Sequence, residues 1–165
     1  MTPREPPLSA PEPLNDSHLI DQFECSEPSL DDWLRRRALA NQASGASRTF
    51  VVCRGAQVLG YYALAAGGIM SNEVPGRLRR NMPDPIPIMV LGRLAVDRRE
   101  HGKGLGALLL RDAIARTARL AQDAGIAGIL VHALSENAKH FYQHWGFVES
   151  PHNPMTLVAR LKDLA

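Results

Sequence analysis

Apolar and polar residues follow two different periods in the second half of the chain. Ile88–Val96 (IMVLGRLAV) is almost entirely apolar, which is typical of a strand buried on both faces of a sheet. From Leu105 to Ala124, apolar residues recur at helical spacing opposite a charged face. Ile129–Ala133 is a second apolar run of strand length. Because a helix joins the two runs, the pattern predicts a βαβ unit with parallel strands and a right-handed crossover.

The first half predicts a helix followed by a hairpin. Ser29 is expected to cap a helix, with Asp32 three residues on as in a capping box, and apolar residues at helical spacing follow, so we expect a helix from about Leu30 to Gln42. Thr49–Cys53 and Val58–Ala66 are β-rich runs separated by a short turn, which indicates a hairpin. Gly67–Pro87 is rich in proline and predicts a long irregular loop, a feature that is usually functional or mobile.

The two ends of the chain differ in character. A short helix is expected at about Asn137–Trp145, followed by strands at Phe147–Val148 and Met155–Leu161. Residues 1–13 hold five prolines and little apolar surface, so they predict a flexible leader. Residues 14–165 are then expected to form one α/β domain with a mixed sheet.

Composition excludes several classes of protein. The 165 residues are 45% hydrophobic, which suits one compact domain without a disulfide or metal to stabilise it. No segment approaches the ~20 apolar residues that a membrane span needs. Since no secretory signal is present, Cys25 and Cys53 are expected to be reduced, and the protein to be cytoplasmic.

The basic residues are unusually rich in arginine. Of 19 basic residues, only Lys103, Lys139 and Lys162 are lysines. Arginine suits bidentate contacts to phosphate, but a GC-rich coding sequence also favours it. Composition alone leaves both explanations open.

The strongest chemical signal is a glycine-rich loop between the first predicted βαβ strand and its helix. Gly102, Gly104 and Gly106 allow the backbone to turn tightly and approach a ligand. The N-terminus of the following helix directs free N–H groups and a favourable dipole at an anion such as a pyrophosphate. The spacing fits neither a P-loop nor a dinucleotide fingerprint, and a glycine-rich turn without a ligand remains an alternative.

Two motifs give the chain a family resemblance. Arg99-x-x-Gly102-x-Gly104 resembles the acetyl-coenzyme A signature of the GNAT acyltransferases, and residues 138–147 (AKHFYQHWGF) resemble a second motif of that family. Further segments between Leu14 and Leu161 resemble the TacT/AtaT-like GNAT toxins, which acetylate the amino group of aminoacyl-tRNA. One position departs from the pattern, because Ser135 stands where many members have asparagine.

The resemblance implies a fold and an activity. The fold is a GNAT α/β fold, with a mixed and mostly antiparallel sheet, a central βαβ unit for acetyl-coenzyme A, and flanking helices. The expected activity is N-acetyl transfer from acetyl-coenzyme A, without a metal, to aminoacyl-tRNA, which blocks translation. The implied partners are a ribbon-helix-helix antitoxin and possible homodimer formation. Two alternatives remain: an acetyltransferase of a small-molecule or protein amine, and a non-catalytic acyl-coenzyme A-binding protein.

The resemblance also assigns site residues. Tyr142 is the expected general acid, because a phenol with a pKa of about 10 holds a proton that it can donate to a departing thiolate. The expected cofactor-binding residues are Leu94, Ala95, Val96, Arg99, Glu100, His101, Gly102, Lys103, Gly104, Leu105, Gly106, Ser135 and Phe141.

Arginines outside the loop are candidates for contacts to the phosphates of tRNA. A solvated basic surface, or an ion pair for Arg93, is the alternative. The candidates are Arg35, Arg36, Arg48, Arg77, Arg79, Arg80 and Arg93.

The remaining titratable residues give no metal site. His140 and His144 lie four apart on a predicted helix, but no third ligand is evident. Cys53 has no recognisable basic partner and is expected to belong to the core rather than to act as a nucleophile. The sequence assigns His132 to neither face of its strand. It also identifies no general base for the reaction.

Overall fold

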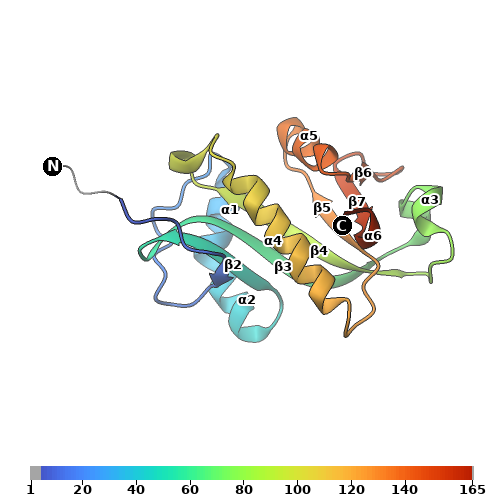
Figure 1. Cartoon of the computed structure of the whole chain (residues 1–165), viewed down its shortest axis with the longest axis horizontal. Helices are drawn as coiled ribbons and strands as arrows, with labels where there is room; N and C mark the ends of the chain where they lie inside the picture. Colours follow the sequence, from blue (N-terminus) through green and yellow to red (C-terminus); the bar gives the residue numbers. More distant parts are fainter. Residues whose placement is uncertain (1–4, 165) are drawn as a thin grey trace. The chain divides into compact units, whose positions relative to one another are not determined.

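The computed structural model describes residues 5–164 and shows a seven-stranded mixed sheet in the order β1-β2-β3-β4-β5-β7-β6 (Figure 1). The strands β4 and β5 are parallel, with a register from Ile88↔Gly128 to Leu91↔Val131. The predicted βαβ unit and the predicted α/β fold are therefore confirmed. The strands are β1 (Glu12–Pro13), β2 (Arg48–Arg54), β3 (Gln57–Ile69), β4 (Ile86–Val96), β5 (Gly128–His132), β6 (Val148–Glu149) and β7 (Thr156–Arg160).

Helices connect these strands at most of the predicted places. The helices are α1 (Pro28–Trp33), a π-helical segment (Leu34–Ala38), α2 (Leu39–Ser44), α3 (Gly76–Arg79), α4 (Leu105–Leu120), α5 (Glu136–His144) and α6 (Leu161–Leu164), with 3₁₀ turns at Ser71–Glu73 and Arg98–Glu100. No helix among the described residues is both long and apolar enough to cross a membrane.

The contacts of the chain divide into two compact units. The first comprises the residues up to Leu64 together with Arg93–Asp112. Its core includes Phe23, Leu34 and Tyr61, and α2 lies against β2 (Figure 1). The start of α4 packs closely on β3, since a Cβ at Gly60 would lie 3.1 Å from side-chain atoms of both Leu105 and Leu109.

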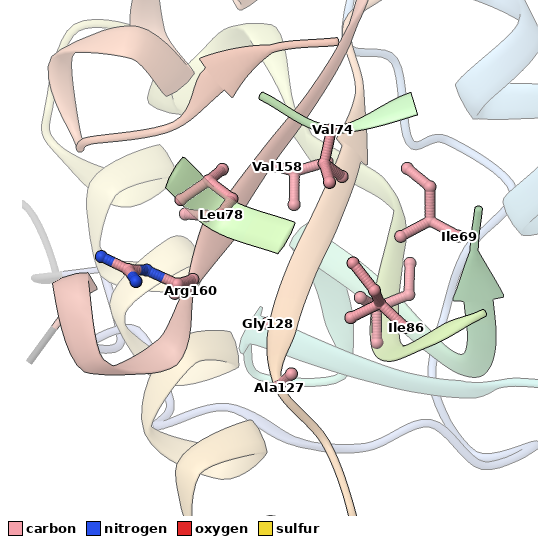
Figure 2. Close-up of a pocket in the computed structure, with 10 residues that line it drawn as sticks. Ile69, Val74, Leu78, Ile86, Ala127, Gly128, Val158 and Arg160 are labelled. Atoms are coloured by element: carbon pink, nitrogen blue, oxygen red, sulfur yellow. The ribbon is translucent and has the colours of Figure 1, made fainter. Parts of the chain in front are cut away.

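The second unit comprises Ala65–Gly92 together with the residues from Ala113 on. Its core is formed by β3, β4, β5 and β7 with the segment between β3 and β4. Figure 2 shows Val74 and Leu78 of that segment pointing toward Val158, and both side chains are buried. The predicted long loop is thus an anchored segment containing α3, closed where Asp84 accepts hydrogen bonds from the backbone N–H and hydroxyl of Ser71.

The first helix is longer than predicted and begins differently. Pro28 occupies its first turn, where a missing N–H costs nothing, and Glu27 precedes it without a side-chain cap. Ser29 therefore does not cap the helix as expected. Asp31 is instead buried and accepts a hydrogen bond from the backbone N–H of Cys25 (2.9 Å), which fixes the chain that enters the helix.

Part of the proline-rich leader lies along β2 and adds β1 at the edge of the sheet. The backbone N–H of Ser9 donates to the carbonyl of Cys53 (2.7 Å), and the N–H of Cys53 donates to the Ser9 hydroxyl (2.9 Å). Glu12 and Pro13 then pair with β2 as β1. These contacts differ from the flexible leader that the composition predicted, because apart from the Ser9 hydroxyl they use backbone groups that any sequence carries. Residues 1–4 lie outside the described part of the chain.

Candidate active site

The glycine-rich loop forms an anion-binding turn at the start of α4. Gly102 (φ +76°) and Gly104 (φ +84°) adopt left-handed backbone conformations, and a Cβ at either position would meet open space. No described residue accepts a hydrogen bond from the backbone N–H groups of residues 102–107. These N–H groups, together with the dipole of α4, are suited to bind a pyrophosphate.

Asp97 holds the entry to this loop. Its buried carboxylate accepts hydrogen bonds from the Arg99 side chain (2.9 Å), from the Arg99 N–H (3.0 Å) and from the Glu24 N–H (3.0 Å). Burial by itself would raise the pKa of Asp97, but these hydrogen bonds hold it below its ordinary value. The guanidinium of Arg99 is therefore turned back onto the chain, whereas the sequence suggested that it reaches the ligand.

Glu100 holds the loop from the other side. Its carboxylate is 2% exposed and lies 2.5 Å from a guanidinium nitrogen of Arg54 and 3.0 Å from Nζ of Lys103. Hydrogen bonds from these two cations hold the pKa of Glu100 below its ordinary value. His101 adds a third tie, because its Nε2 donates to the carbonyl of Val96 (2.7 Å). Among the predicted loop residues, the side chains of Arg99, Glu100 and His101 therefore hold the turn in place. The backbone N–H groups of residues 102–107 are left to bind a ligand.

A basic cavity of about 280 Å³ lies beside the loop in the same unit. Arg54, Arg99 and Lys103 line it, together with Glu5 and Glu100. Arg54 lies in no sequence motif and 46 positions before its partner Glu100, so no local pattern identifies it. Only the folded structure brings the end of β2 to the loop.

We expect Glu100→Gln to be less stable than the wild type at neutral pH, and its stability to depend less on acid. The folded-state pKa of Glu100 lies below its unfolded value of about 4.3, so its stabilisation is complete above that pH and is lost as the pH falls through the folded-state pKa. Urea midpoints measured between about pH 7 and pH 3 test this expectation. Asp21→Asn, at an exposed site, is the control. Parallel acid profiles for Glu100→Gln and the wild type would contradict the expectation.

Tyr142 lies on α5 in the second unit. The helix begins at Ser135, whose hydroxyl accepts from the N–H of Ala138 (3.1 Å), and ends before Gly146 (φ +100°). The Tyr142 ring is 5% exposed and packs on Phe141 and Phe147, with centroids 5.3 Å and 5.7 Å away.

The Tyr142 hydroxyl retains its proton at neutral pH. Burial raises its pKa above the ordinary value of about 10, and no described residue accepts a hydrogen bond from it. The group is therefore a proton donor with no acceptor in the described part of the chain, as a general acid requires. Of the other two candidates on this segment, Ser135 caps α5, and Phe141 is half-buried beside Tyr142.

Three of the predicted arginines in the first unit have internal partners. Arg35 donates to the carbonyl of Phe23 (2.8 Å) and Arg48 to the carbonyl of Gln42 (2.6 Å). The Arg93 guanidinium lies 4.4 Å from the ring centroid of Trp33. Arg36 is exposed without a side-chain hydrogen bond to another described residue.

The second unit gathers Arg77, Arg79 and Arg80 on and beside α3. All three are exposed, while Val74 and Leu78 of the same segment are buried. The segment therefore presents its charges to solvent from an anchored backbone, which suits contacts to phosphates.

Burial accounts for the two cysteines, and hydrogen bonds account for the one group of possible metal ligands among the described residues. Burial raises the pKa of Cys25 to about 12 and that of Cys53 to about 11, so neither thiol is a nucleophile at neutral pH. Glu12, His18 and Cys53 bring ligand atoms within 4.8 Å of one another. However, Nδ1 of His18 accepts from the N–H of Asn15 (3.0 Å), which leaves the proton on the Nε2 that contacts Glu12.

The chain is similar in sequence and structure to known acetyltransferases. The acetyltransferase (GNAT) domain pattern matches residues 45–149. The tRNA-acetylating toxin of Mycobacterium tuberculosis (strain ATCC 25618 / H37Rv) is 52% identical over 94% of this chain and 93% of its own. The structure of AtaT complexed with acetyl-methionyl-tRNAfMet matches with a TM-score of 0.88 and 30% identity, over 96% of this chain and 97% of that one.

A further solved structure is that of a tyrosine-to-phenylalanine mutant of the AtaT toxin, bound to the C-terminus of the antitoxin AtaR and to acetyl-CoA. It matches with a TM-score of 0.81 and 30% identity, over 95% of each chain.

Proposed function

The chain belongs to the GNAT family of acetyltransferases, and from this premise we propose that it is a toxin that transfers the acetyl group of acetyl-coenzyme A to the amino group of aminoacyl-tRNA. Aminoacyl-tRNA is supported as the acceptor substrate by the 52% identity with a tRNA-acetylating toxin over nearly the whole chain. The donor is supported by the N–H groups of residues 102–107, which have no acceptor in residues 5–164 and fit the pyrophosphate of coenzyme A.

Each part of the site has a separate task in this reaction. When bound, acetyl-coenzyme A supplies a thioester carbonyl for attack by the acceptor amine. The backbone of residues 102–106 binds the pyrophosphate, and Asp97 and Glu100 hold that backbone in position. Tyr142 holds a proton at its hydroxyl and donates it to the departing sulfur. We assign the backbone of Leu94, Ala95 and Val96 to the acetyl end of the donor, where N–H groups can stabilise the developing oxyanion.

We assign phosphate contacts of the acceptor to the exposed arginines of α3. Arg77→Gln/Arg79→Gln is expected to raise the KM for charged tRNA, to leave the KM for acetyl-coenzyme A unchanged, and to reduce the slope of log KM against log salt by about 1 for each lost contact. Arg111→Gln/Arg119→Gln, exposed on α4, is the matched control. Initial rates with labelled acetyl-coenzyme A and bulk charged tRNA, at a series of salt concentrations, give these slopes.

The same experiment tests the proposed function itself. The expected product is labelled N-acetyl-aminoacyl-tRNA, and its amino acid identifies the acceptor. A flat salt profile in the wild type would instead favour a small-molecule or protein amine. Binding of acetyl-coenzyme A without transfer to any amine would favour a non-catalytic protein.

The proposal extends to partners and location. An antitoxin that binds this chain is supported by the AtaT complex with the C-terminus of AtaR. We propose a ribbon-helix-helix antitoxin, a possible homodimer, and the cytoplasm, where charged tRNA is found. We also propose that residues 14–165 act as one acetyltransferase domain.

A further inference from the structure

A cavity of about 470 Å³ in the second unit has no role in the proposed donor site. Its floor is formed by Ile69, Ile88, Val90 and Leu130, and its rim includes Glu73 and His132. Ile88 and Val90 lie on one face of β4, because side chains two apart on a strand share a face. Leu130 and His132 share a face of β5 for the same reason, and the register Val90↔Leu130 sets Leu130 beside Val90.

The position of His132 within this cavity is fixed by hydrogen bonds. Its Nδ1 lies 3.1 Å from the hydroxyl oxygen of Thr156 on the neighbouring strand β7. The backbone of Thr156 is itself held at both ends, because its N–H donates to Asn153 and its carbonyl accepts from the N–H of Ser150. The cavity therefore has an ordered polar rim above an apolar floor, as small-molecule sites do.

The charges that line the cavity disfavour a phosphate ligand. Among the described residues that line it there is no lysine or arginine, Glu73 supplies the one carboxylate, and His132 and His152 supply imidazoles. A phosphate would meet the Glu73 carboxylate without a lysine or arginine to oppose it, whereas an amine or a neutral group would be accepted. The chemistry of this cavity is thus opposite to that of the basic cavity beside the glycine-rich loop.

The segment between β3 and β4 separates acidic from basic groups. Glu73 lines the cavity, while Arg77, Arg79 and Arg80 lie a few residues further along the same segment and are exposed. Val74 and Leu78 are buried between them and hold the segment to the core (Figure 2). A ligand that ends in an amine and continues as a phosphate chain matches this order of charges.

Resting on the proposed function, we propose that this cavity holds the aminoacyl group of the acceptor. Glu73 attracts the amine, and the apolar floor selects uncharged aliphatic side chains. An acidic aminoacyl group is rejected, because its carboxylate would lie beside the like charge of Glu73. Glu73, Val90 and Leu130 are then specificity-determining residues.

Two variants at an exposed position test the charge. Glu73→Gln is expected to raise the KM for charged tRNA by about tenfold, the effect of losing one charged contact, with kcat and the KM for acetyl-coenzyme A unchanged. Glu73→Lys is expected to raise the rate with aspartyl-tRNA relative to alanyl-tRNA, a gain that loss of folding cannot produce. Asp123→Asn, exposed near the end of α4, is the matched control.

One variant tests the volume. Val90→Phe is expected to shift the preference toward glycyl-tRNA over methionyl-tRNA, because the added ring fills the floor of the cavity. Leu120→Phe, on the exposed surface of α4, adds a ring elsewhere and is expected to change nothing. Thermal melting of each variant shows whether it folds. If Val90→Phe does not fold, the two Glu73 variants still test whether the cavity binds the aminoacyl group.

A binding measurement separates this inference from the proposed function. A 3′-aminoacylamido-adenosine that cannot be hydrolysed is added to the wild type, and methyl NMR shifts are followed. We expect shifts at Ile69, Ile88 and Leu130 that are weaker in Glu73→Gln. If the wild type acetylates charged tRNA while these shifts and all variant effects are absent, the cavity is not the acceptor site. If no charged tRNA is acetylated, the proposed function fails instead.

Discussion

Tyr142→Phe is expected to lower kcat by roughly 10²–10⁴-fold, the usual contribution of a general acid, without changing the melting temperature. The substitution removes only the hydroxyl, and no described residue accepts a hydrogen bond from it. The ring keeps its contacts with Phe141 and Phe147, so packing is preserved. Single-turnover rates with labelled acetyl-coenzyme A measure the loss, and equilibrium binding shows that the donor still binds.

Tyr61→Phe is the matched control for Tyr142→Phe. The Tyr61 hydroxyl donates to the carbonyl of Leu30 (2.6 Å) inside the first core, and its loss removes this bond from a carbonyl that also accepts from the N–H of Leu34. We expect the control to lose about 1 kcal/mol of stability and to keep its turnover. Unchanged turnover in Tyr142→Phe would remove this phenol from the proton transfer.

Gly128→Ala is expected to cost about 3 kcal/mol in the free energy of unfolding, at the upper end for overpacking. Gly128 lies in the middle of the sheet, and a Cβ there would lie 2.4 Å from the carbonyl oxygen of Ala159 on β7. Because the obstructing atom belongs to the backbone of a paired strand, it cannot move aside without disturbing the β5–β7 register. Urea denaturation of the two proteins measures the difference.

Gly125→Ala provides the control three positions earlier. A Cβ at Gly125 meets open space, and the residue follows the C-terminal end of α4. The substitution reduces the entropy of the unfolded chain without a clash, so we expect no loss and a gain of up to about 1 kcal/mol. Equal stability of the two alanine variants would show that β5 and β7 are less closely packed than the structure indicates.

The central βαβ unit and the glycine-rich loop could be predicted because their signals are local. Ile88–Val96 is too apolar for any exposed element, and Gly102 and Gly104 stand where a strand gives way to a helix. The structure adds the left-handed conformations and the open space around both glycines. Local patterns of this kind determine elements and turns without knowledge of the rest of the chain.

The parts that could not be predicted depend on pairings between distant residues. The contact of Arg54 with Glu100 and the position of His132 on the cavity rim both follow from strand register, which no short motif encodes. Arg93 resembled a phosphate ligand in the sequence, yet it lies over the Trp33 ring, because α1 and β4 meet in the first core. The N-terminal segment was unpredictable for the related reason that backbone groups make most of its contacts with β2.

Arg54 links the N-terminal segment to the loop that we assign to donor binding. Its guanidinium contacts the carbonyl of Pro6 (2.8 Å) and Glu5 on one side and the Glu100 carboxylate on the other. Trimming the leader, or fusing an affinity tag directly to it, would therefore alter the surroundings of a side chain that braces the pyrophosphate turn. Purified protein meant for kinetics should carry its tag at a distance from residue 5, with an untagged sample as reference.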